Sequence, residues 1–197
     1  MPQSDPAALV LASSSRHRKK LLDRLGLEFT CFSPDIDESP LPDETAHALA
    51  CRLAQAKARK LADRFDNAAI IGCDQVAVCE GRYLGKPGNY ETALQQLQQA
   101  AGKEVLFLTS VCLLRVPDGF CQIETVPCRA VFRKLSQDTL ASYLQREQPF
   151  DCAAAFQSEG LGIALLERLD CEDPTALIGL PLMRLCRMLE KAGIAVL

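Results

Sequence analysis

Histidine is scarce in this sequence and tryptophan is absent: the 197 residues include two histidines and no tryptophan. Ten cysteines are present, but no two are spaced as C-x-x-C, and only two histidines exist to complete a zinc site. Most of the cysteines lie in apolar runs, so we expect reduced, buried thiols that pack as small hydrophobic side chains. The pattern argues against a fold that zinc stabilises.

The sequence also lacks a long apolar run and an excess of positive charge. No window approaches the roughly 18 uninterrupted apolar residues of a membrane span, and residues 1–5 lack the basic-then-apolar pattern of a signal peptide. We therefore expect a cytoplasmic protein without a membrane partner. The formal net charge of -3 gives no broad basic field for nucleic acid polymers, so the cations that hold any anionic ligand must be local.

Strand and helix patterns alternate along the chain, which predicts an α/β fold in one domain, residues 1–197. Apolar runs bounded by turn residues predict strands at 8–12, 28–33, 68–72, 75–79, 105–116, 120–132 and 162–169. Helical spacing and capping residues predict helices from the turn at 13–15 to Gly26 and at 43–65, 90–101, 136–146 and 182–191.

Hydroxyl and cationic side chains follow the first predicted strand, in residues 13–19 (SSSRHRK). Because a helix N-terminus exposes unpaired N–H groups and partial positive charge, this turn suits phosphate binding. The alternative is a serine cap followed by a solvated basic helix face.

A single carboxylate, that of Asp74, follows an apolar strand that is too hydrophobic to lie at the surface. From there it can orient a metal-bound water or accept its proton. A buried aspartate that pairs with a helix end is the alternative interpretation.

Three other segments carry groups of the same kind. Lys86 lies between a glycine and a proline and can contact phosphate, although a turn lysine is usually solvated. The pair Asp37 and Glu38 can hold a divalent cation or form a solvated loop. The glycine-rich turn at 156–162 presents one carboxylate before a predicted strand, or marks only a tight bend.

The order of these segments resembles the Maf-like family. The similarity rests on LASxS at 11–15, SPDIDE at 33–38, RLAxxKA at 52–58, GxD at 72–74 and GKP at 85–87, and it continues through 156–162 and 179–182. It implies a two-lobed Maf/ITPase-like α/β fold, with an elongated mixed β-sheet flanked by helices and a central nucleotide cleft. It also implies hydrolysis of nucleoside triphosphates to monophosphate and pyrophosphate with a divalent cation, Mg²⁺ or Mn²⁺, and it favours a homodimer.

The resemblance assigns roles to individual residues. Asp74 is expected to accept the proton of the attacking water and, with Glu38, to bind the metal. The residues expected to bind the substrate phosphates are Ser13, Ser15, Arg18, Lys57 and Lys86.

Two positions resemble the branch of the family that acts on 7-methyl-GTP: Gln75, next to the aspartate, and Glu159, in the glycine-rich turn. The branch that acts on dTTP and UTP has threonine and glutamine there. Two positions depart from the family: Arg16 replaces the usual proline, and His17 replaces the tryptophan of one branch and the arginine of the other. An imidazole can stack on a purine with less area than an indole, and a protonated one would repel a cationic base.

We therefore expect hydrolysis of 7-methyl-GTP to 7-methyl-GMP and pyrophosphate, with His17, Gln75 and Glu159 contacting the base. The carboxylate of Glu159 can accept hydrogen bonds from both N1–H and the exocyclic amine of guanine, and methylation at N7 adds a positive charge that attracts it. The alternatives are a pyrophosphatase for dTTP, UTP or other non-standard nucleotides, and a nucleotide-sensing regulator of septum formation.

Overall fold

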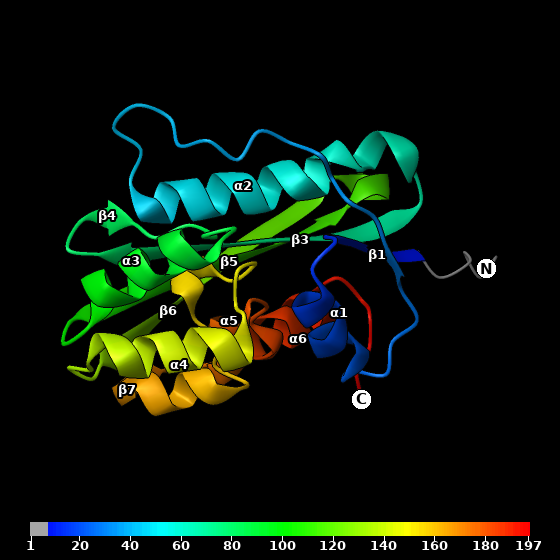
Figure 1. The fold of residues 1–197 in the computed structure, drawn as a ribbon. Coiled ribbons are helices and arrows are strands. Elements are labelled where there is room, and N and C mark those ends of the chain that lie inside the picture. Colours follow the sequence, from blue (N-terminus) through cyan, green and yellow to red (C-terminus); the bar gives the residue numbers. More distant parts are fainter. Residues whose placement is uncertain (1–7) are drawn as a thin grey trace, which may run out of the picture.

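A seven-stranded mixed sheet forms the centre of the protein in a computed structural model, which describes residues 8–197 (Figure 1). The strands are β1 (Ala8–Ala12), β2 (Thr30–Cys31), β3 (Ala68–Cys79), β4 (Arg82–Tyr83), β5 (Glu104–Arg115), β6 (Phe120–Phe132) and β7 (Leu166–Cys171). Their order is β2-β1-β3-β5-β6-β7, with β4 paired to β3. β1 runs parallel to β2 and β3, and the other pairs are antiparallel. The elongated mixed sheet confirms the predicted α/β class, while the interpretation of residues 1–5 lies outside the described residues.

Helices cover both faces of this sheet (Figure 1). They are α1 (Arg16–Asp23), α2 (Ala46–Lys60), α3 (Tyr90–Ala100), α4 (Gln137–Glu147), α5 (Pro174–Ile178) and α6 (Leu182–Lys191). Because successive side chains of a strand point to opposite faces, Val10 and Ile70 pack on the side of α2, whereas Leu11 and Ile71 pack on the side of α1 and α6. Within residues 8–197, no helix is long and apolar enough to cross a membrane.

β1 is much shorter than its neighbour β3. Its last residue, Ala12, pairs with Gly72, yet β3 continues to Cys79. In the described part of the chain, residues 73–76 therefore have β5 on one side and no strand on the other. At this open edge, side chains from both faces of the sheet can reach the same space.

The continuity of β3 corrects one prediction. We expected strands at 68–72 and 75–79 with Asp74 at the end of the first, but Asp74 lies inside a single strand and pairs with Ser110 of β5. Only the pairing with β1 ends before Asp74, and this leaves one edge of β3 open.

Other boundaries also differ from the sequence-based expectation. The predicted strand at 28–33 is reduced to Thr30–Cys31, and the predicted helix at 43–65 spans Ala46–Lys60 and is followed by a 3-10 turn. Residues Leu161–Leu165 form a 3-10 helix, so the strand expected at 162–169 begins only at Leu166. Helix α5 was not predicted at all.

Two cysteines depart from the expectation that all are thiols. Cys128 of β6 and Cys171 of β7 face each other in the strand register and form a disulfide. They are 43 positions apart in the sequence, so no spacing pattern reveals the pair. The other eight cysteines are free thiols.

Candidate functional site

A cavity of about 890 Å³ lies at the open edge of β3. Its lining comes from the turn after β1, from residues 33–38, from α2 and β3, from the turn after β4, and from the segments around residues 151–159 and 177–179. All ten residues proposed from the sequence line it: Ser13, Ser15, His17, Arg18, Glu38, Lys57, Asp74, Gln75, Lys86 and Glu159. The fold thus brings together groups that are spread over most of the chain.

The turn between β1 and α1 is held by its own hydroxyl groups. Ser15 is the N-cap of α1, and its Oγ accepts a hydrogen bond from the Arg18 N–H. The Oγ of Ser13 accepts one from the Ser15 N–H at 3.1 Å. The Arg18 side chain is fixed by its Nε, which donates to the carbonyl oxygen of Gly179 at 2.9 Å. The turn therefore presents a guanidinium and a helix N-terminus to the cavity.

Two buried charges in the cavity, Lys57 and Asp74, form a trio with the exposed carboxylate of Glu38. The Lys57 ammonium donates to Asp74 Oδ1 at 2.6 Å and lies 2.7 Å from Glu38 Oε1. Lys57 is 5% exposed and Asp74 is 6% exposed, so this ion pair lies in a medium of low polarity where it is strong. Removal of Lys57 or Asp74 would leave the other buried charge without its closest partner.

A glycine allows this trio to form. A Cβ at Gly72 would overlap the carbonyl oxygen of Ala54 and lie 2.8 Å from the backbone nitrogen of Ala58, both in α2. Only a residue without a side chain lets α2 approach β3 this closely. The close approach sets the distance over which Lys57 reaches Asp74.

The two carboxyl groups of the trio differ in basicity. Burial raises the pKa of Asp74 above its usual value, and the charges of Lys57 and Arg18 offset this only in part. Burial also acts to raise the pKa of Glu38, but there the hydrogen bond and charge of Lys57, with Lys86 and Arg18, outweigh it and the pKa is lowered. Asp74 is therefore the better proton acceptor, and Glu38 the more persistent anion.

Gln75 points to the opposite face of β3 from Asp74. Its amide nitrogen donates to Thr109 Oγ1 at 2.9 Å and to the carbonyl oxygens of Ala176 and Leu177 at 3.0 and 3.1 Å. These bonds attach α5 to β3 and β5. The amide nitrogen is thus occupied within the protein, and the amide oxygen is the atom left for a ligand.

His17 and Glu159 lie together on another wall of the cavity. The Nδ1 atom of His17 is 3.2 Å from Glu159 Oε1, and their side chains are 15% and 35% exposed. One oxygen of this carboxylate therefore remains free toward the cavity. The contact joins the start of α1 to the glycine-rich turn, 142 positions away.

The glycine-rich turn is held by residues that the sequence analysis did not identify. The Tyr143 hydroxyl donates to the Ala155 carbonyl and accepts from the Gln157 N–H, each at 3.2 Å. Glu147 accepts from the Leu161 N–H at 2.7 Å. Both residues come from α4, and no local motif marks them.

Asp173 organises the wall formed by α5 and α6. It is 1% exposed, caps α5 through the Thr175 N–H at 3.0 Å, and accepts from the Met183 N–H at 2.8 Å. An aspartate directly before Pro174 is a typical helix start, so this signal was present in the sequence. Cys73, behind the same wall, donates its thiol to Gly179, and burial raises its pKa to about 11, which makes it unreactive.

Comparison with known proteins agrees with this geometry. A model of the Maf-like protein family matches residues 8–192. The 7-methyl-GTP pyrophosphatase of Nitrosococcus oceani is 50% identical over 197 residues, which are 100% of this chain and 99% of the relative. The 7-methyl-GTP pyrophosphatase of Pseudomonas savastanoi pv. phaseolicola is 52% identical over 189 residues, 96% of this chain and 98% of the relative. By its sequence and by the mixed sheet that carries its cavity, this chain belongs to the Maf-like family.

Proposed function

We propose that this protein hydrolyses 7-methyl-GTP to 7-methyl-GMP and pyrophosphate, which removes a modified nucleotide from the pool. The observation that carries the proposal is that one cavity gathers the cationic side chains of Arg18, Lys57 and Lys86 with the carboxylates of Asp74 and Glu38, both of which contact Lys57. The full-length relatives named for this activity support the choice of substrate.

Asp74 accepts the proton of the attacking water in this proposal. Its raised pKa makes it a stronger base than an exposed aspartate, and the charge of Lys57 favours its ionised form. Arg18 and Lys86 neutralise the phosphate oxygens, as Lys57 also does from the buried side. Ser13 and Ser15 hold the turn against which the phosphates lie.

The donor atoms of Glu38 and Asp74 fit a divalent cation. In the structure both carboxylates converge on one cation, the Lys57 ammonium, and carboxylate oxygens are the ligands that Mg²⁺ and Mn²⁺ prefer. We therefore propose that Glu38 and Asp74 hold the metal. When bound, it supplies positive charge that stabilises the charge developing on the phosphates.

The Asp74→Asn variant tests the proposal. The amide has nearly the same shape but cannot accept a proton, so we expect pyrophosphate release to fall by roughly two to four orders of magnitude. A matched control is Asp66→Asn, an exposed aspartate outside the cavity. A folded Asp74→Asn protein that retains near-full turnover would show that Asp74 is not the base.

The alternatives are separated by a substrate panel of 7-methyl-GTP, GTP, dTTP and UTP with Mg²⁺ or Mn²⁺. Preference for dTTP and UTP would keep the mechanism and overturn the roles of Gln75 and Glu159. Binding without turnover of any nucleotide would favour a regulator that senses nucleotides. The buried base Asp74 favours hydrolysis, because a sensor needs no group that activates water.

We also propose that the reaction takes place in the cytoplasm and that the protein is a homodimer. The location is supported by the substrate, a soluble nucleotide, and the dimer by the resemblance to the family. Cell fractionation tests the first. Light scattering on the purified protein tests the second, and the mass of a single chain would contradict it.

A further inference from the structure

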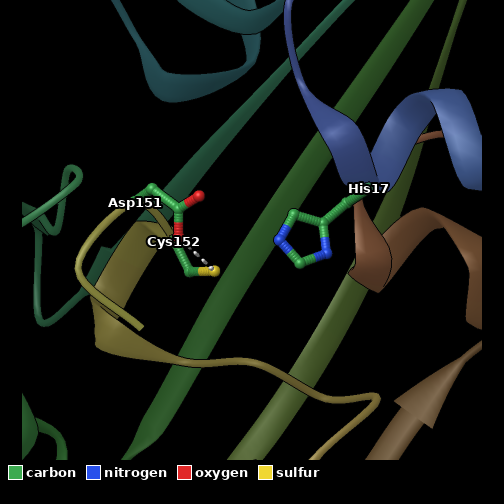
Figure 2. Close-up of side chains that lie close together, drawn as sticks. All are labelled: His17, Asp151 and Cys152. Carbon is green, nitrogen blue, oxygen red and sulfur yellow. Dashed lines mark hydrogen bonds between the residues drawn. The ribbon is translucent and has the colours of Figure 1, made fainter. Parts of the chain in front are cut away.

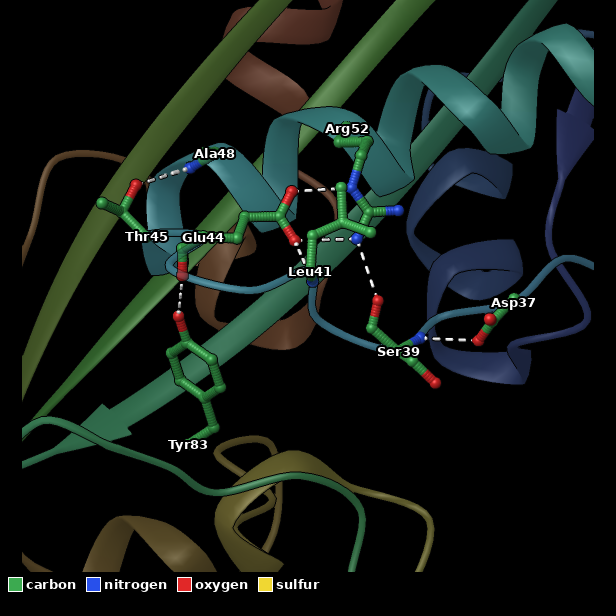
Figure 3. Close-up of polar contacts among 8 residues, drawn as sticks. All are labelled: Asp37, Ser39, Leu41, Glu44, Thr45, Ala48, Arg52 and Tyr83. Atoms are coloured by element: carbon green, nitrogen blue, oxygen red, sulfur yellow. Dashed lines mark hydrogen bonds and ion pairs between the residues drawn. The ribbon is translucent and has the colours of Figure 1, made fainter.

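Three side chains with metal-binding atoms, none of them part of the Lys57 trio, meet in the lining of the cavity. They belong to His17, Asp151 and Cys152, and one ligand atom from each lies within 4.8 Å of the others. Figure 2 shows the imidazole ring of His17 facing Asp151 and Cys152. The Cys152 thiol is 3.6 Å from Asp151 Oδ1.

The imidazole is oriented as a metal ligand would be. Its Nε2 atom is buried and has no hydrogen-bond partner among the described residues. Its Nδ1 atom lies 3.2 Å from the Glu159 carboxylate. In metal sites the second ring nitrogen of a histidine usually donates to a carboxylate, which fixes the tautomer and leaves the other nitrogen free for the ion.

We propose that His17 Nε2, the Asp151 carboxylate and Cys152 Sγ bind a zinc ion, with Glu159 orienting the imidazole. The donor set of one nitrogen, one sulfur and one oxygen is typical of Zn²⁺ and unsuited to Mg²⁺. Three protein ligands leave the fourth tetrahedral position open to water or to a substrate group.

The geometry requires only a small adjustment. Zinc bonds of about 2.0 to 2.3 Å at tetrahedral angles place ligand atoms roughly 3.3 to 3.8 Å apart, so the widest pair must close by about 1 Å. The Asp151 side chain is 56% exposed, and its only ion pair with a residue of the described range 8–197 is a 3.7 Å contact with Arg16, which costs little to release. Binding forms the Zn–S bond and breaks the S–H bond, and the proton passes to solvent.

The charge balance also favours a dication. Without a metal, burial and the charge of Asp151 raise the pKa of the Cys152 thiol to about 12, so the thiolate forms only as zinc displaces the proton. The Asp151 carboxylate and this thiolate then carry two negative charges, which neutralise Zn²⁺. This site is separate from the one formed by Glu38 and Asp74, whose oxygen atoms suit Mg²⁺ or Mn²⁺. Spacing patterns could not reveal it, since His17 lies at the start of α1 and the other two ligands precede the glycine-rich turn.

If the protein has the proposed function, zinc bound at this location should affect how the base of the substrate binds. The ion would lie beside Glu159, the carboxylate proposed to hold the cationic base. Zinc binding changes the net charge of the Asp151–Cys152 pair from -1 to zero and holds Glu159 on the imidazole N–H, so both changes weaken the attraction for the base. Zinc should therefore inhibit hydrolysis of 7-methyl-GTP, and loss of Cys152 should relieve the inhibition.

Cobalt spectroscopy tests the site without any activity measurement. Co²⁺ added to the full chain with the Cys152 thiol reduced should produce a thiolate-to-cobalt charge-transfer band and the visible bands of a tetrahedral ion, and one equivalent of Zn²⁺ should remove them. Cys152→Ser should abolish the charge-transfer band, and Asp151→Asn should weaken Co²⁺ binding at least about tenfold. The matched control is Cys51→Ser, because Cys51 also contacts a histidine, His47, at 3.8 Å but is not part of the cluster.

The outcomes are distinct. An unchanged band in folded Cys152→Ser protein, or loss of the band in Cys51→Ser, would overturn the site. A band that depends on Cys152 in a protein that hydrolyses no nucleotide would support the metal site and refute the proposed function. Zinc inhibition of equal strength in wild type and Cys152→Ser would refute the effect on the base.

Discussion

At the residue scale, the chemistry of the site depends on one buried pair. Asp74 is buried, and this burial raises the pKa of its carboxyl group. The positive charge of the Lys57 ammonium opposes the rise. The balance between the two determines the pH at which the base is available.

The pH profile follows from this balance. Only ionised Asp74 accepts a proton, so kcat/KM should fall as the pH decreases through its pKa, and that acidic limb should lie above the value of about 3.9 for an ordinary aspartate. Lys57→Met removes the charge that favours the ionised form and should move the limb to still higher pH. The profile of kcat/KM against pH, recorded for both proteins, measures this. A limb at or below the ordinary value, or one that Lys57→Met leaves in place, would contradict it.

The preference for one nucleotide base over another also depends, in the proposed function, on a single residue, Glu159. In Glu159→Gln the amide can accept only with its oxygen, and it has no charge to attract a methylated guanine. We expect the ratio of 7-methyl-GTP to dTTP turnover to fall by roughly tenfold or more, because hydrogen bonds to charged groups contribute about 1.5 to 3 kcal/mol. Glu167→Gln, an exposed change in β7, is the control. An unchanged ratio would mean that Glu159 does not contact the base.

The location of the proposed site residues was easier to predict than their contacts, and their roles in the reaction stay predictions. The ten proposed site residues all line the cavity, because their types and order match a family pattern. The use of Gln75 was not predictable, since its hydrogen bonds go to Ala176 and Leu177 in a helix that sequence reasoning had not identified. A side chain's partners depend on the whole fold, not on its neighbours in the sequence.

At the scale of the elements, the site exists because β1 stops where β3 continues. Gly72 lies at that boundary, opposite Ala12 and directly under α2. The helix is as close to the strand as the backbone permits, and the Lys57 to Asp74 distance depends on that approach.

Gly72→Ala should therefore affect both stability and activity. Its Cβ meets backbone atoms of α2, which cannot rotate away, so we expect a loss of at least about 1 to 3 kcal/mol of unfolding free energy and a fall in turnover as Lys57 is displaced. Urea unfolding and pyrophosphate release measure the two effects. Gly85→Ala is the control for stability, because a Cβ there meets no atom within 4 Å. Equal stability of the two variants would refute the close packing.

Long, strongly patterned elements were predicted well, and short ones were not. The predicted strand at 120–132 and helix at 182–191 have the bounds seen in the structure, since apolar periodicity and clear stop residues mark them. The break expected near Asp74 was wrong because a polar residue at an open sheet edge interrupts the hydrophobic pattern without interrupting the strand. The five-residue α5 depends on the cap of Asp173 and on tertiary bonds more than on periodicity.

At the scale of the whole molecule, one strand connects every part of the hydrophobic interior. β3 contributes Ile70, Ile71, Val76 and Ala77 to four different clusters of buried side chains. The cavity likewise takes its walls from the first turn, from α2 and from the segment at 151–159. Shared elements of this kind favour cooperative unfolding, and the single domain over residues 1–197 stays a prediction from the sequence.

Because β3 joins the four clusters and the cavity, a bound nucleotide should raise the free energy of unfolding of the whole domain in a single transition. The Asp74→Asn protein should bind 7-methyl-GTP with Mg²⁺ without consuming it, and at about 100 times the Kd the gain is about 2.7 kcal/mol. For a chain of this size such a gain corresponds to roughly 5 to 10 °C in Tm. Differential scanning calorimetry should show one transition that moves as a whole, with dTTP giving a smaller shift. Two transitions, of which only one responds to the nucleotide, would mean that the parts on either side of the cavity unfold independently and that β3 does not couple them.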